Sequence, residues 1–350
     1  MAKAGILGTG WIAELHARTL RSQGIEIAAV VGHSEENTQL FADKWSIPYY
    51  GIDMDLLYEK SVDCVHICTP PKHHHSAIKA LLSHGKHVLC EKPLCLDIAE
   101  AEELAALAEN SGLICAVGFN IRYYLACNKA KKLVQSDDFG RILLIHGSYL
   151  QEFGASPAQH SWRYADKLHA VTEIGSHWLD LVQYISGKRI ISVSAQFDRF
   201  HPLRYTKDGM LYSEPVDQGK IVHIPSEDVA LLSLRFEDGA IGSVVLSELS
   251  HGRENSLSFE ITGERQSLWW SSDFQNNLYL ARKGASLSVL KFEDHFDNTF
   301  SRLIQEVYHA IEVNKPSGFP TFAEAQANVR LCEALWQSAE NNSCWTEVLR

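Results

Sequence analysis

The sequence predicts an α/β chain with two domains: a doubly wound parallel sheet, then an α+β domain with an open, mostly antiparallel sheet. Two observations support this. Over residues 1–120, short apolar runs alternate with segments that have the apolar period of a helix. After residue 120, the pattern is typical of several strands with alternating polar and apolar residues, followed by two helices. The length of 350 residues also exceeds what one hydrophobic core usually organises. We therefore expect domains over residues 1–120 and 121–350.

The apolar runs of the first domain are predicted to be buried strands, because none of them has a polar face. They occupy residues 4–8, 25–31, 62–68, 86–90 and 113–119. Segments with a 3.6-residue apolar period lie between them and predict helices over residues 11–24, 34–45, 73–85 and 97–112. Such a βαβ series packs helices on both faces of one parallel sheet.

The second domain is predicted to be built on a sheet with mostly antiparallel strands. Residues 230–247 predict a hairpin, because Asp238-Gly239 separates two alternating runs and tolerates the positive φ of a type I′ turn. Further strands are expected at residues 141–151, 190–197, 256–263, 266–272 and 276–283, and helices near 299–313 and 322–340. Residues 198–227 show no clear period and predict a loop-rich insertion that covers a site or a subunit contact.

A glycine pattern directly follows the first predicted strand and opens the first predicted helix. It reads Gly8-Thr9-Gly10-Trp11-Ile12-Ala13. In this context Gly8 permits a tight turn, Gly10 leaves room for a pyrophosphate, and Ala13 allows close packing of helix on strand. The helix start offers N–H groups to phosphate oxygens. The pattern predicts a Rossmann dinucleotide-binding domain, with the pyrophosphate against residues 8–12.

The end of the second predicted strand bears on the choice between NAD and NADP. An acidic residue is expected there to hold the ribose hydroxyls of NAD, but residues 31–34 read Val-Gly-His-Ser. Without a carboxylate, a 2′-phosphate meets no repulsion and His33 and Ser34 can donate hydrogen bonds to it. We favour NADP(H). The alternatives are that Glu35 or Glu36 replaces the missing carboxylate, or that backbone contacts hold NAD.

Two loops are expected at the carboxyl edge of the parallel sheet, where doubly wound folds bind their ligands. Thr69-Pro70 follows one strand, and Glu91-Lys92-Pro93 follows the next. A lysine in that position can hydrogen-bond a substrate oxygen and stabilise charge as an alcohol loses its proton. We therefore expect Thr69-Pro70 to contact the cofactor and Lys92 to face a ligand cleft.

Metal and disulfide chemistry are not expected. His73-His74-His75 are adjacent on a predicted helix, where successive side chains point about 100° apart and cannot all grip one ion. No Cys-x-x-Cys pair occurs among the eight cysteines, most of which lie in or beside apolar runs. They are typical of small buried hydrophobes in a reducing cytoplasm.

Charge and hydropathy limit the partners that we expect. The net charge is −11 and the basic residues are scattered, so nucleic acid and anionic membranes are not expected partners. No apolar stretch is long enough to cross a bilayer, and the apolar N-terminal run meets glycine too soon for a signal peptide. We predict a cytoplasmic homodimer or homotetramer, with Trp269-Trp270 and Tyr279 exposed on the second sheet as candidate interface residues.

Several motifs, in order along nearly the whole chain, resemble the Gfo/Idh/MocA family of oxidoreductases, which includes inositol dehydrogenases and glucose-fructose oxidoreductase. Besides the glycine turn they are Thr69-Pro70 with His74, Glu91-Lys92-Pro93, Gly118-Phe119-Asn120-Ile121-Arg122-Tyr123, Trp162-Arg163 and Gly175-Ser176-His177. The resemblance implies an NAD(P)-dependent enzyme that oxidises a hydroxyl of a sugar, cyclitol or sugar derivative, or reduces the corresponding ketone.

The resemblance also implies a catalytic group, which matches Lys92, Glu173 and His177 here. The family usually has Asp where this chain has Glu173, which leaves the reach of its carboxylate open. Asp180 lies one turn beyond His177 and is expected to contact substrate or brace the histidine. Implied cofactor contacts are Thr69, Pro70, His74, Glu91, Lys92, Asn120 and Arg163, and implied substrate contacts are Lys92, Arg122, Tyr123, Trp162, His177 and Asp180.

Simple chemistry supports these roles. Hydride leaves a carbinol carbon as the hydroxyl proton is taken, and histidine, with an ordinary pKa of about 6.5, suits that proton at neutral pH. His177 is the candidate general base, Lys92 favours the developing alkoxide, and Glu173 fixes the imidazole. The alternatives are a glycosidase that uses NAD for transient ring oxidation, and a nucleotide-binding sensor without catalysis.

Overall fold

The computed structural model describes residues 2–59, 61–315 and 318–349. The chain forms two compact units, one made of Met1–Tyr123 with His295–Val329 and the other of Tyr124–Asp294 with Arg330–Arg350. The chain first passes from one unit to the other after Tyr123, close to the boundary expected at residue 120. Residues 295–329, which we expected in the second domain, belong instead to the first unit, because the apolar side chains of this segment join its core.

The first unit is built on a six-stranded parallel sheet with the order β3-β2-β1-β4-β5-β6. Its strands are β1 (Ala4–Leu7), β2 (Ile27–Val31), β3 (Tyr49–Gly51), β4 (Cys64–Ile67), β5 (His87–Cys90) and β6 (Cys115–Val117). Five of these confirm the predicted strands. The sequence analysis missed β3, which is short and exposed at the sheet edge and therefore has no apolar run.

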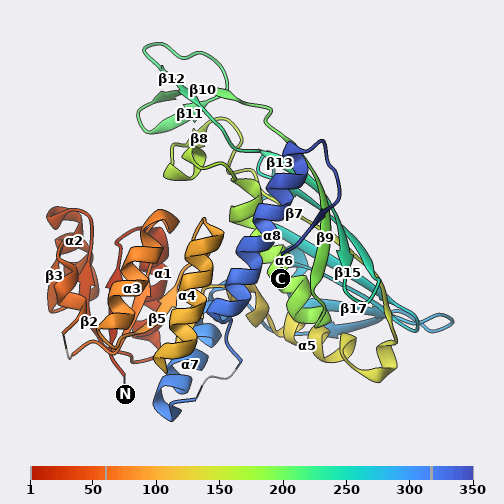
Figure 1. Cartoon of the computed structure of the whole chain (residues 1–350), viewed down its shortest axis with the longest axis horizontal. Coiled ribbons are helices and arrows are strands. Elements are labelled where there is room, and N and C mark those ends of the chain that lie inside the picture. Colours follow the sequence, from red (N-terminus) through yellow and green to blue (C-terminus); the bar gives the residue numbers. More distant parts are fainter. Residues whose placement is uncertain (1, 60, 316–317, 350) are drawn as a thin grey trace. The chain divides into compact units, whose positions relative to one another are not determined.

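Helices cover both faces of this sheet, which confirms the doubly wound fold. They are α1 (Trp11–Ser22), α2 (Glu35–Trp45), α3 (His74–Ser83), α4 (Ile98–Ser111), α7 (Phe296–Val313) and the start of α8 (Phe322–Glu340). One core cluster joins α1, α2 and α7 to the sheet, and the other joins α3, α4 and α8. In Figure 1, α3 and α4 lie side by side.

The second unit contains a nine-stranded sheet with the order β18-β17-β16-β15-β7-β14-β13-β9-β19. Its strands are β7 (Ile142–Leu150), β9 (Ile190–Asp198), β13 (Val229–Phe236), β14 (Ile241–Ser247), β15 (Ser256–Gly263), β16 (Ser267–Ser271), β17 (Asn277–Ala281), β18 (Ser288–Lys291) and β19 (Thr346–Glu347). All neighbours are antiparallel except β7 and β14. The predicted mostly antiparallel sheet is confirmed.

Helices α5 (Leu125–Val134) and α6 (Ser176–Ser186) pack against each other in this unit. The indole of Trp178 on α6 is fully buried and donates to the Ser258 carbonyl on β15, 2.8 Å away. Along β13, buried and exposed side chains alternate, and Leu231 is 46% exposed. One face of the sheet therefore carries exposed apolar side chains, as expected of an open sheet.

The insertion predicted at residues 198–227 contains a small sheet that the sequence analysis missed. Three strands lie in this stretch, β10 (Leu203–Lys207), β11 (Met210–Tyr212) and β12 (Lys220–His223), and with β8 (Ala158–Gln159) they form a sheet in the order β12-β10-β11-β8. Positive φ angles at Asp208 and Gly209 allow a two-residue turn of the I′ kind between β10 and β11.

The hairpin predicted at residues 230–247 is confirmed, but its turn differs from the predicted type. Gly239 has a φ of +88°, whereas Asp238 does not have a positive φ. The N–H of Phe236 bonds the Ala240 carbonyl and that of Gly239 bonds the Phe236 carbonyl, so the loop is longer than two residues. The Asp-Gly pair thus predicts a hairpin more reliably than it predicts a turn type.

Candidate functional site

The glycine turn after β1 takes the conformation that a phosphate-binding turn requires. Gly8 has a φ of +111°, and a Cβ at this position would lie 2.9 Å from the Cys68 carbonyl oxygen. Glycine therefore allows the turn to approach the loop after β4. Ala13, in the first turn of α1, is fully buried, as expected for the third position of the pattern.

Three observations show that the turn suits a dinucleotide. A Cβ added at Gly10 meets no atom within 4 Å, so the space over the start of α1 is open. No side chain caps the first turn of α1, which leaves its N–H groups available for an anion. Across from it, the Thr69 hydroxyl is buried without a hydrogen-bond partner among the described residues. A cofactor atom is a natural partner for this hydroxyl.

Gly32, His33 and Ser34, which are predicted to meet the ribose, follow β2 and lead into α2. His33 is exposed, and Ser34 is the N-cap of α2, where its hydroxyl accepts from the Asn37 N–H at 3.3 Å. The Ser34 hydroxyl keeps its own hydrogen for donation. A Cβ at Gly32 would lie 2.1 Å from the Thr38 hydroxyl, so glycine is required where the β2 end meets α2.

Lys92 lies in the turn that follows β5, at the same carboxyl edge of the sheet as the glycine turn. Its side chain is half-buried, and its backbone N–H donates to the Glu91 carboxylate at 3.3 Å. Glu91 itself is 7% exposed and accepts from the His16 imidazole at 3.0 Å. Glu91, which we expected to contact the cofactor, is therefore held by the protein.

His74 does not present a surface to a ligand. It is fully buried, with Nε2 2.8 Å from the Thr69 carbonyl and Nδ1 3.0 Å from the Pro93 carbonyl. Burial lowers the pKa of its imidazole. The expected cofactor contact is thus replaced by a structural role, since His74 ties the Thr69-Pro70 loop to the turn that carries Lys92.

Three further predicted ligand contacts are buried inside the first unit. Asn120 is 2% exposed and donates to the Thr299 hydroxyl at 2.8 Å. Arg122 is 4% exposed and pairs with the Glu324 carboxylate at 2.8 Å, which lowers the pKa of that carboxyl. The prediction that Arg122 and Tyr123 contact substrate is not supported, because their polar groups bond residues of α7 and α8.

Tyr123 illustrates why the motif misled us. Its ring belongs to the core cluster with α1 and α7, and its hydroxyl donates to the Glu306 carboxylate on α7. The backbone carbonyl of Tyr123 accepts from Arg302 of the same helix at 2.8 Å. The stretch after β6 therefore anchors α7 to the first unit.

The segment that carries Glu173 and His177 belongs to the second unit. A π-helical turn over Val171–Gly175 leads directly into α6. Within residues 171–180 every residue is buried except Glu173 and His177. The two side chains predicted for catalysis therefore share the accessible side of this segment, although the helix changes from π to α between them.

Glu173 also has a partner that the sequence analysis did not identify. Its carboxylate accepts from the Arg163 guanidinium at 2.9 Å, and that guanidinium lies 4.5 Å above the Trp162 ring. Trp162 and Arg163, predicted to contact substrate and cofactor, are therefore joined to the predicted catalytic acid. Asp180 is 4% exposed, which favours the bracing role over substrate contact.

A buried acid that we did not predict holds the start of this segment. The Glu227 carboxylate accepts from the N–H of Val171 at 2.8 Å and from that of His169 at 3.1 Å. Burial raises the pKa of Glu227 to about 7, although these N–H groups oppose the shift. The sequence signal was weak, because Ser226-Glu227-Asp228 resembles any polar turn before a strand.

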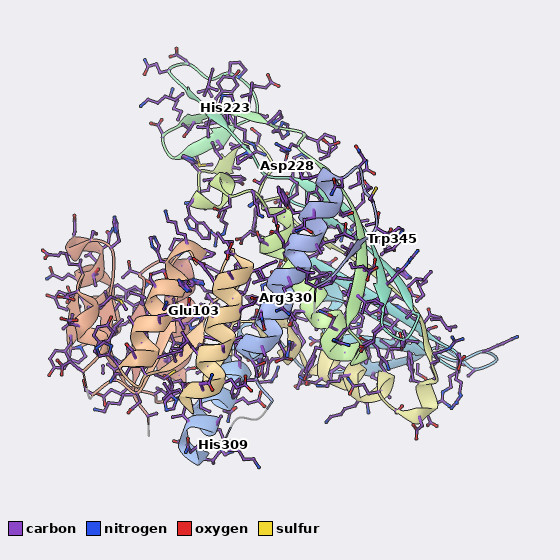
Figure 2. The ribbon with its side chains drawn as sticks, in the orientation of Figure 1. Glu103, His223, Asp228, His309, Arg330 and Trp345 are labelled. Atoms are coloured by element: carbon purple, nitrogen blue, oxygen red, sulfur yellow. The ribbon has the colours of Figure 1, made fainter. Side chains whose placement is uncertain are left out.

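Neighbouring groups continue this buried polar cluster. Asp228, labelled in Figure 2, lies 3.4 Å from the guanidinium of Arg204, and both side chains are almost fully buried. Arg204 comes from β10, so the strand that we predicted as loop supplies a buried charge to this cluster. Burial lowers the pKa of His169 to about 4, with Glu173 and Asp228 opposing the shift.

The three adjacent histidines separate, as the helical geometry predicts. His75 lies 2.7 Å from the Glu103 carboxylate, labelled on α4 in Figure 2, whereas His74 is buried against the Thr69-Pro70 loop. Among the described residues, no three histidine, cysteine or acidic side chains are grouped to hold a metal ion. Within the same residues, no helix is long and apolar enough to span a membrane.

Comparison with known sequences agrees with this geometry. Residues 2–119 match an oxidoreductase family with an NAD-binding Rossmann fold, and residues 127–269 match the GFO/IDH/MocA C-terminal domain. The chain belongs to the Gfo/Idh/MocA oxidoreductase family. The two matches lie on either side of residue 120, where the sequence predicts the change of domain.

Several family members with assigned activities are similar in sequence. Levoglucosan dehydrogenase of Pseudarthrobacter phenanthrenivorans is 29% identical over 65% of this chain, and the aligned part is 60% of that protein. The NAD(+)-dependent scyllo-inositol 2-dehydrogenase of Bacillus subtilis is 25% identical over 94% of this chain and 91% of its own length.

Solved structures share the whole fold. An oxidoreductase domain protein from Kribbella flavida is 26% identical, with a TM-score of 0.92 and coverage of 100% of this chain and 99% of that one. A levoglucosan dehydrogenase in complex with NADH and L-sorbose is 22% identical, with a TM-score of 0.91 over 100% and 99% of the two chains. At this identity, the second likeness supports the fold alone.

The two glycines of the phosphate turn are expected to respond differently to alanine. Gly8→Ala lowers the free energy of unfolding by about 1–3 kcal/mol, because it combines a positive φ with a close approach to the Cys68 carbonyl. Gly10→Ala changes it by less than about 0.5 kcal/mol and raises the Kd for NADPH or NADH about tenfold, because its methyl occupies the open cradle. Urea unfolding measures the change in stability, and nucleotide fluorescence measures the change in Kd. Unchanged nucleotide binding by Gly10→Ala would contradict the assignment of this turn to phosphate binding.

Glu227 is expected to make stability depend on pH. The pKa of Glu227 rises from the ordinary 4.5 to about 7 on folding. The contribution of Glu227 to the free energy of unfolding is therefore largest below pH 4.5 and is lost as the pH rises through 7. Relative to Glu227→Gln, the wild-type protein should lose up to about 3 kcal/mol of unfolding free energy between pH 5 and pH 8. Urea melts across this range measure the difference. The exposed control Glu254→Gln should show no such trend, and a flat difference for Glu227→Gln argues against the shifted pKa.

Proposed function

We propose that this protein is an NAD(P)-dependent dehydrogenase or ketoreductase that acts on a sugar, a cyclitol or a sugar derivative. The observation that carries the proposal is Lys92, half-buried in the turn after β5, at the same sheet edge as a glycine turn that suits a dinucleotide. The activities of levoglucosan and scyllo-inositol dehydrogenases, which are similar in sequence, support the substrate class.

In the proposed reaction each side chain has a defined task. The His177 imidazole is the general base for the hydroxyl proton of the substrate, and the Lys92 ammonium donates a hydrogen bond that stabilises developing negative charge on substrate oxygen. The bound nicotinamide supplies the hydride acceptor or donor. Thr69 hydrogen-bonds the cofactor through its orphaned hydroxyl, and the N–H groups of Trp11 and Ile12 hold its pyrophosphate.

Glu173 takes a somewhat different role from the one that the family pattern implies. It lies on the same accessible stripe as His177, and its carboxylate is paired with Arg163. We propose that Glu173 holds Arg163 and Trp162 beside the imidazole, where they contact ligand. Asp180 braces the helix below His177. The glycosidase and sensor alternatives gain no support from the arrangement of these residues.

Substitution of the two proton-handling residues tests the proposal. Lys92→Ala and His177→Ala should each lower kcat/KM about 10²-fold or more, because each removes a group that acts in the transition state. The assay follows NAD(P)H absorbance with a panel that includes levoglucosan, scyllo-inositol and myo-inositol.

Two matched controls probe surface residues of the same types. Lys72→Ala and His73→Ala alter exposed side chains near the start of α3, and both should retain activity. Full activity of the Lys92→Ala and His177→Ala variants would contradict the proposed mechanism. Release of product from a glycoside without accumulation of reduced cofactor would indicate the glycosidase instead.

We further propose that NADP(H) is the preferred cofactor, although the similar scyllo-inositol 2-dehydrogenase uses NAD(+) and the levoglucosan dehydrogenase structure contains NADH. Support comes from the sequence after β2, where Gly32, exposed His33 and the Ser34 hydroxyl stand before the first acids of α2. None of these three residues carries a negative charge that would repel a 2′-phosphate.

Substitution of His33 by an acidic residue tests the preference for NADP(H). His33→Asp should lower kcat/KM for NADP(H) about tenfold or more, because a carboxylate repels the 2′-phosphate, and should leave NAD(H) within about threefold. The neutral control His33→Asn should change neither cofactor strongly. A wild-type protein that uses NAD(H) tenfold better than NADP(H) contradicts the preference.

We also propose a cytoplasmic homodimer or homotetramer that assembles through the nine-stranded sheet. Exposed apolar side chains on β13 and β14 support it, since Leu231, Ile241 and Val245 are each more than 40% exposed. Trp269 is half-buried and stacks on Tyr279 at 5.4 Å, but Trp270 is 1% exposed and is not available for an interface. Seven of the eight free thiols are buried, which suits a reducing compartment.

Sedimentation velocity tests the assembly. The wild-type protein should sediment as a dimer or tetramer at micromolar concentration, and Val245→Lys should shift it towards the monomer because a buried ammonium is costly. Lys291→Ala, at a sheet position remote from β14 in the strand order, is the control. A monomeric wild-type protein refutes this part of the proposal.

A further inference from the structure

Four buried polar side chains form a continuous row of hydrogen bonds inside the first unit. The Tyr308 hydroxyl lies 3.1 Å from His66 Nε2, His66 Nδ1 lies 2.8 Å from His16 Nδ1, and His16 Nε2 lies 3.0 Å from Glu91 Oε1. The exposed fractions are 0% for both histidines, 5% for Tyr308 and 7% for Glu91. They come from α7, β4, α1 and the end of β5.

The apolar surroundings would make this row destabilise the folded protein if any of its polar groups lacked a hydrogen-bond partner. Side chains on both sides of the row belong to the apolar cluster of α1, α7 and the sheet, and the Phe300 ring packs edge-on against His16 at 5.7 Å. A buried polar group without a partner costs about 1–3 kcal/mol, so a row of four is retained only when all its bonds are made.

The contacts allow an order in which every donor of the row points towards Glu91. Burial and the neighbouring His16 hold the pKa of His66 well below its usual range, and burial holds that of Tyr308 well above it, so both groups are neutral. In that order His16 donates from Nε2 to a Glu91 oxygen and accepts at Nδ1. His66 then donates from Nδ1 and accepts at Nε2 from the hydroxyl of Tyr308, which also hydrogen-bonds the Cys64 thiol. All the donors therefore point towards Glu91.

The row ends at the turn that carries Lys92. One oxygen of the Glu91 carboxylate accepts from His16, and the other accepts from the backbone N–H of Lys92 at 3.3 Å. On its remaining side the carboxylate lies against Gly118, where a Cβ would approach Oε1 to 2.7 Å. The orientation of the carboxylate, and with it the backbone of Lys92, is set by His16 and by the absence of a side chain at Gly118.

We propose that His16 is a positioning residue: its hydrogen bond to Glu91 holds the turn that presents Lys92, while His66, backed by Tyr308, bonds the other ring nitrogen of His16. Because His16 lies on α1, the helix that begins at the phosphate-binding turn, the row also fixes that turn relative to Lys92. The inference rests on the proposed catalytic role of Lys92 for its effect on rate, but the row of hydrogen bonds stands apart from it.

Two substitutions of His16 separate its two hydrogen bonds. Glutamine places its amide where the imidazole has Nε2, so His16→Gln keeps a donor for Glu91 and loses the acceptor for His66. Asparagine reaches only the Nδ1 position, so His16→Asn keeps the acceptor and loses the donor. Both variants leave a polar group in the same buried space, which makes them controls for each other.

The kinetic test uses the cyclitol or sugar that the wild-type protein turns over. His16→Asn should lower kcat about tenfold or more and change KM for the nicotinamide cofactor less than about threefold, because the cradle at Gly10 is intact while Lys92 is misplaced. His16→Gln should retain kcat within about threefold. Tyr308→Phe, which removes only the far end of the row, should also stay within about threefold.

A second readout needs no activity. Two-bond ¹H–¹⁵N spectra of the cofactor-free protein, assigned with His16→Gln and His66→Asn, should show His66 protonated at Nδ1 and His16 at Nε2 at pH 7.5. His66 protonated at Nε2, two doubly protonated rings, or equal kcat for His16→Gln and His16→Asn would each overturn the inference. If Lys92→Ala retains full activity, the proposed function fails, while the spectra still decide the order of the row.

Discussion

Glu91 is a carboxylate buried at the carboxyl edge of a parallel sheet, and the first unit supplies hydrogen-bond donors for it from separate elements. An unpaired buried charge costs several kcal/mol, so its donors must be in place whenever the sheet is folded. One donor is His16 on α1, and the other is the N–H of Lys92. The helix that begins at the phosphate turn and the turn that carries Lys92 are thus joined through one carboxylate.

The second unit meets the same constraint in another way. Glu227 is also a buried carboxylate, and its donors are backbone N–H groups at the start of the π-helical turn that carries Glu173. Backbone donors cannot rotate away, so the acid and the helix start fix each other. In the first unit, buried Glu91 therefore holds the backbone of Lys92. In the second unit, buried Glu227 holds the start of the segment that carries Glu173.

The sequence predicted the regular elements well because their signals are local. The βαβ series, the hairpin at residues 230–247 and the helices α7 and α8 follow from apolar period and turn residues. It failed where the signal was short or polar. β3 is an exposed edge strand of three residues, and β10–β12 alternate weakly, although Asp208-Gly209 is the same turn signal that was used at Asp238-Gly239.

The sequence analysis named candidate site residues, but it did not predict the contacts that hold them. Lys92, Glu173 and His177 stand on accessible faces, whereas Arg122, Tyr123 and His74 are buried against partners that lie far away in the sequence. A motif shows that a residue type is required and does not show whether it faces a ligand or the core. His66 was a visible clue, because it is the only polar side chain within a strand that otherwise reads Cys-Val-Ile.

The glutamate at position 173 shows how such a contact can alter chemistry. The family usually has the shorter aspartate there, and the extra methylene lets this carboxylate extend to Arg163, which lies on the Trp162 ring. A carboxylate that shares its charge with a guanidinium presents a weaker field to a neighbouring imidazole than a lone one does. The pairing is consistent with the role that we propose for this acid, which is to hold Trp162 and Arg163, the residues that the sequence analysis assigned to ligand contact.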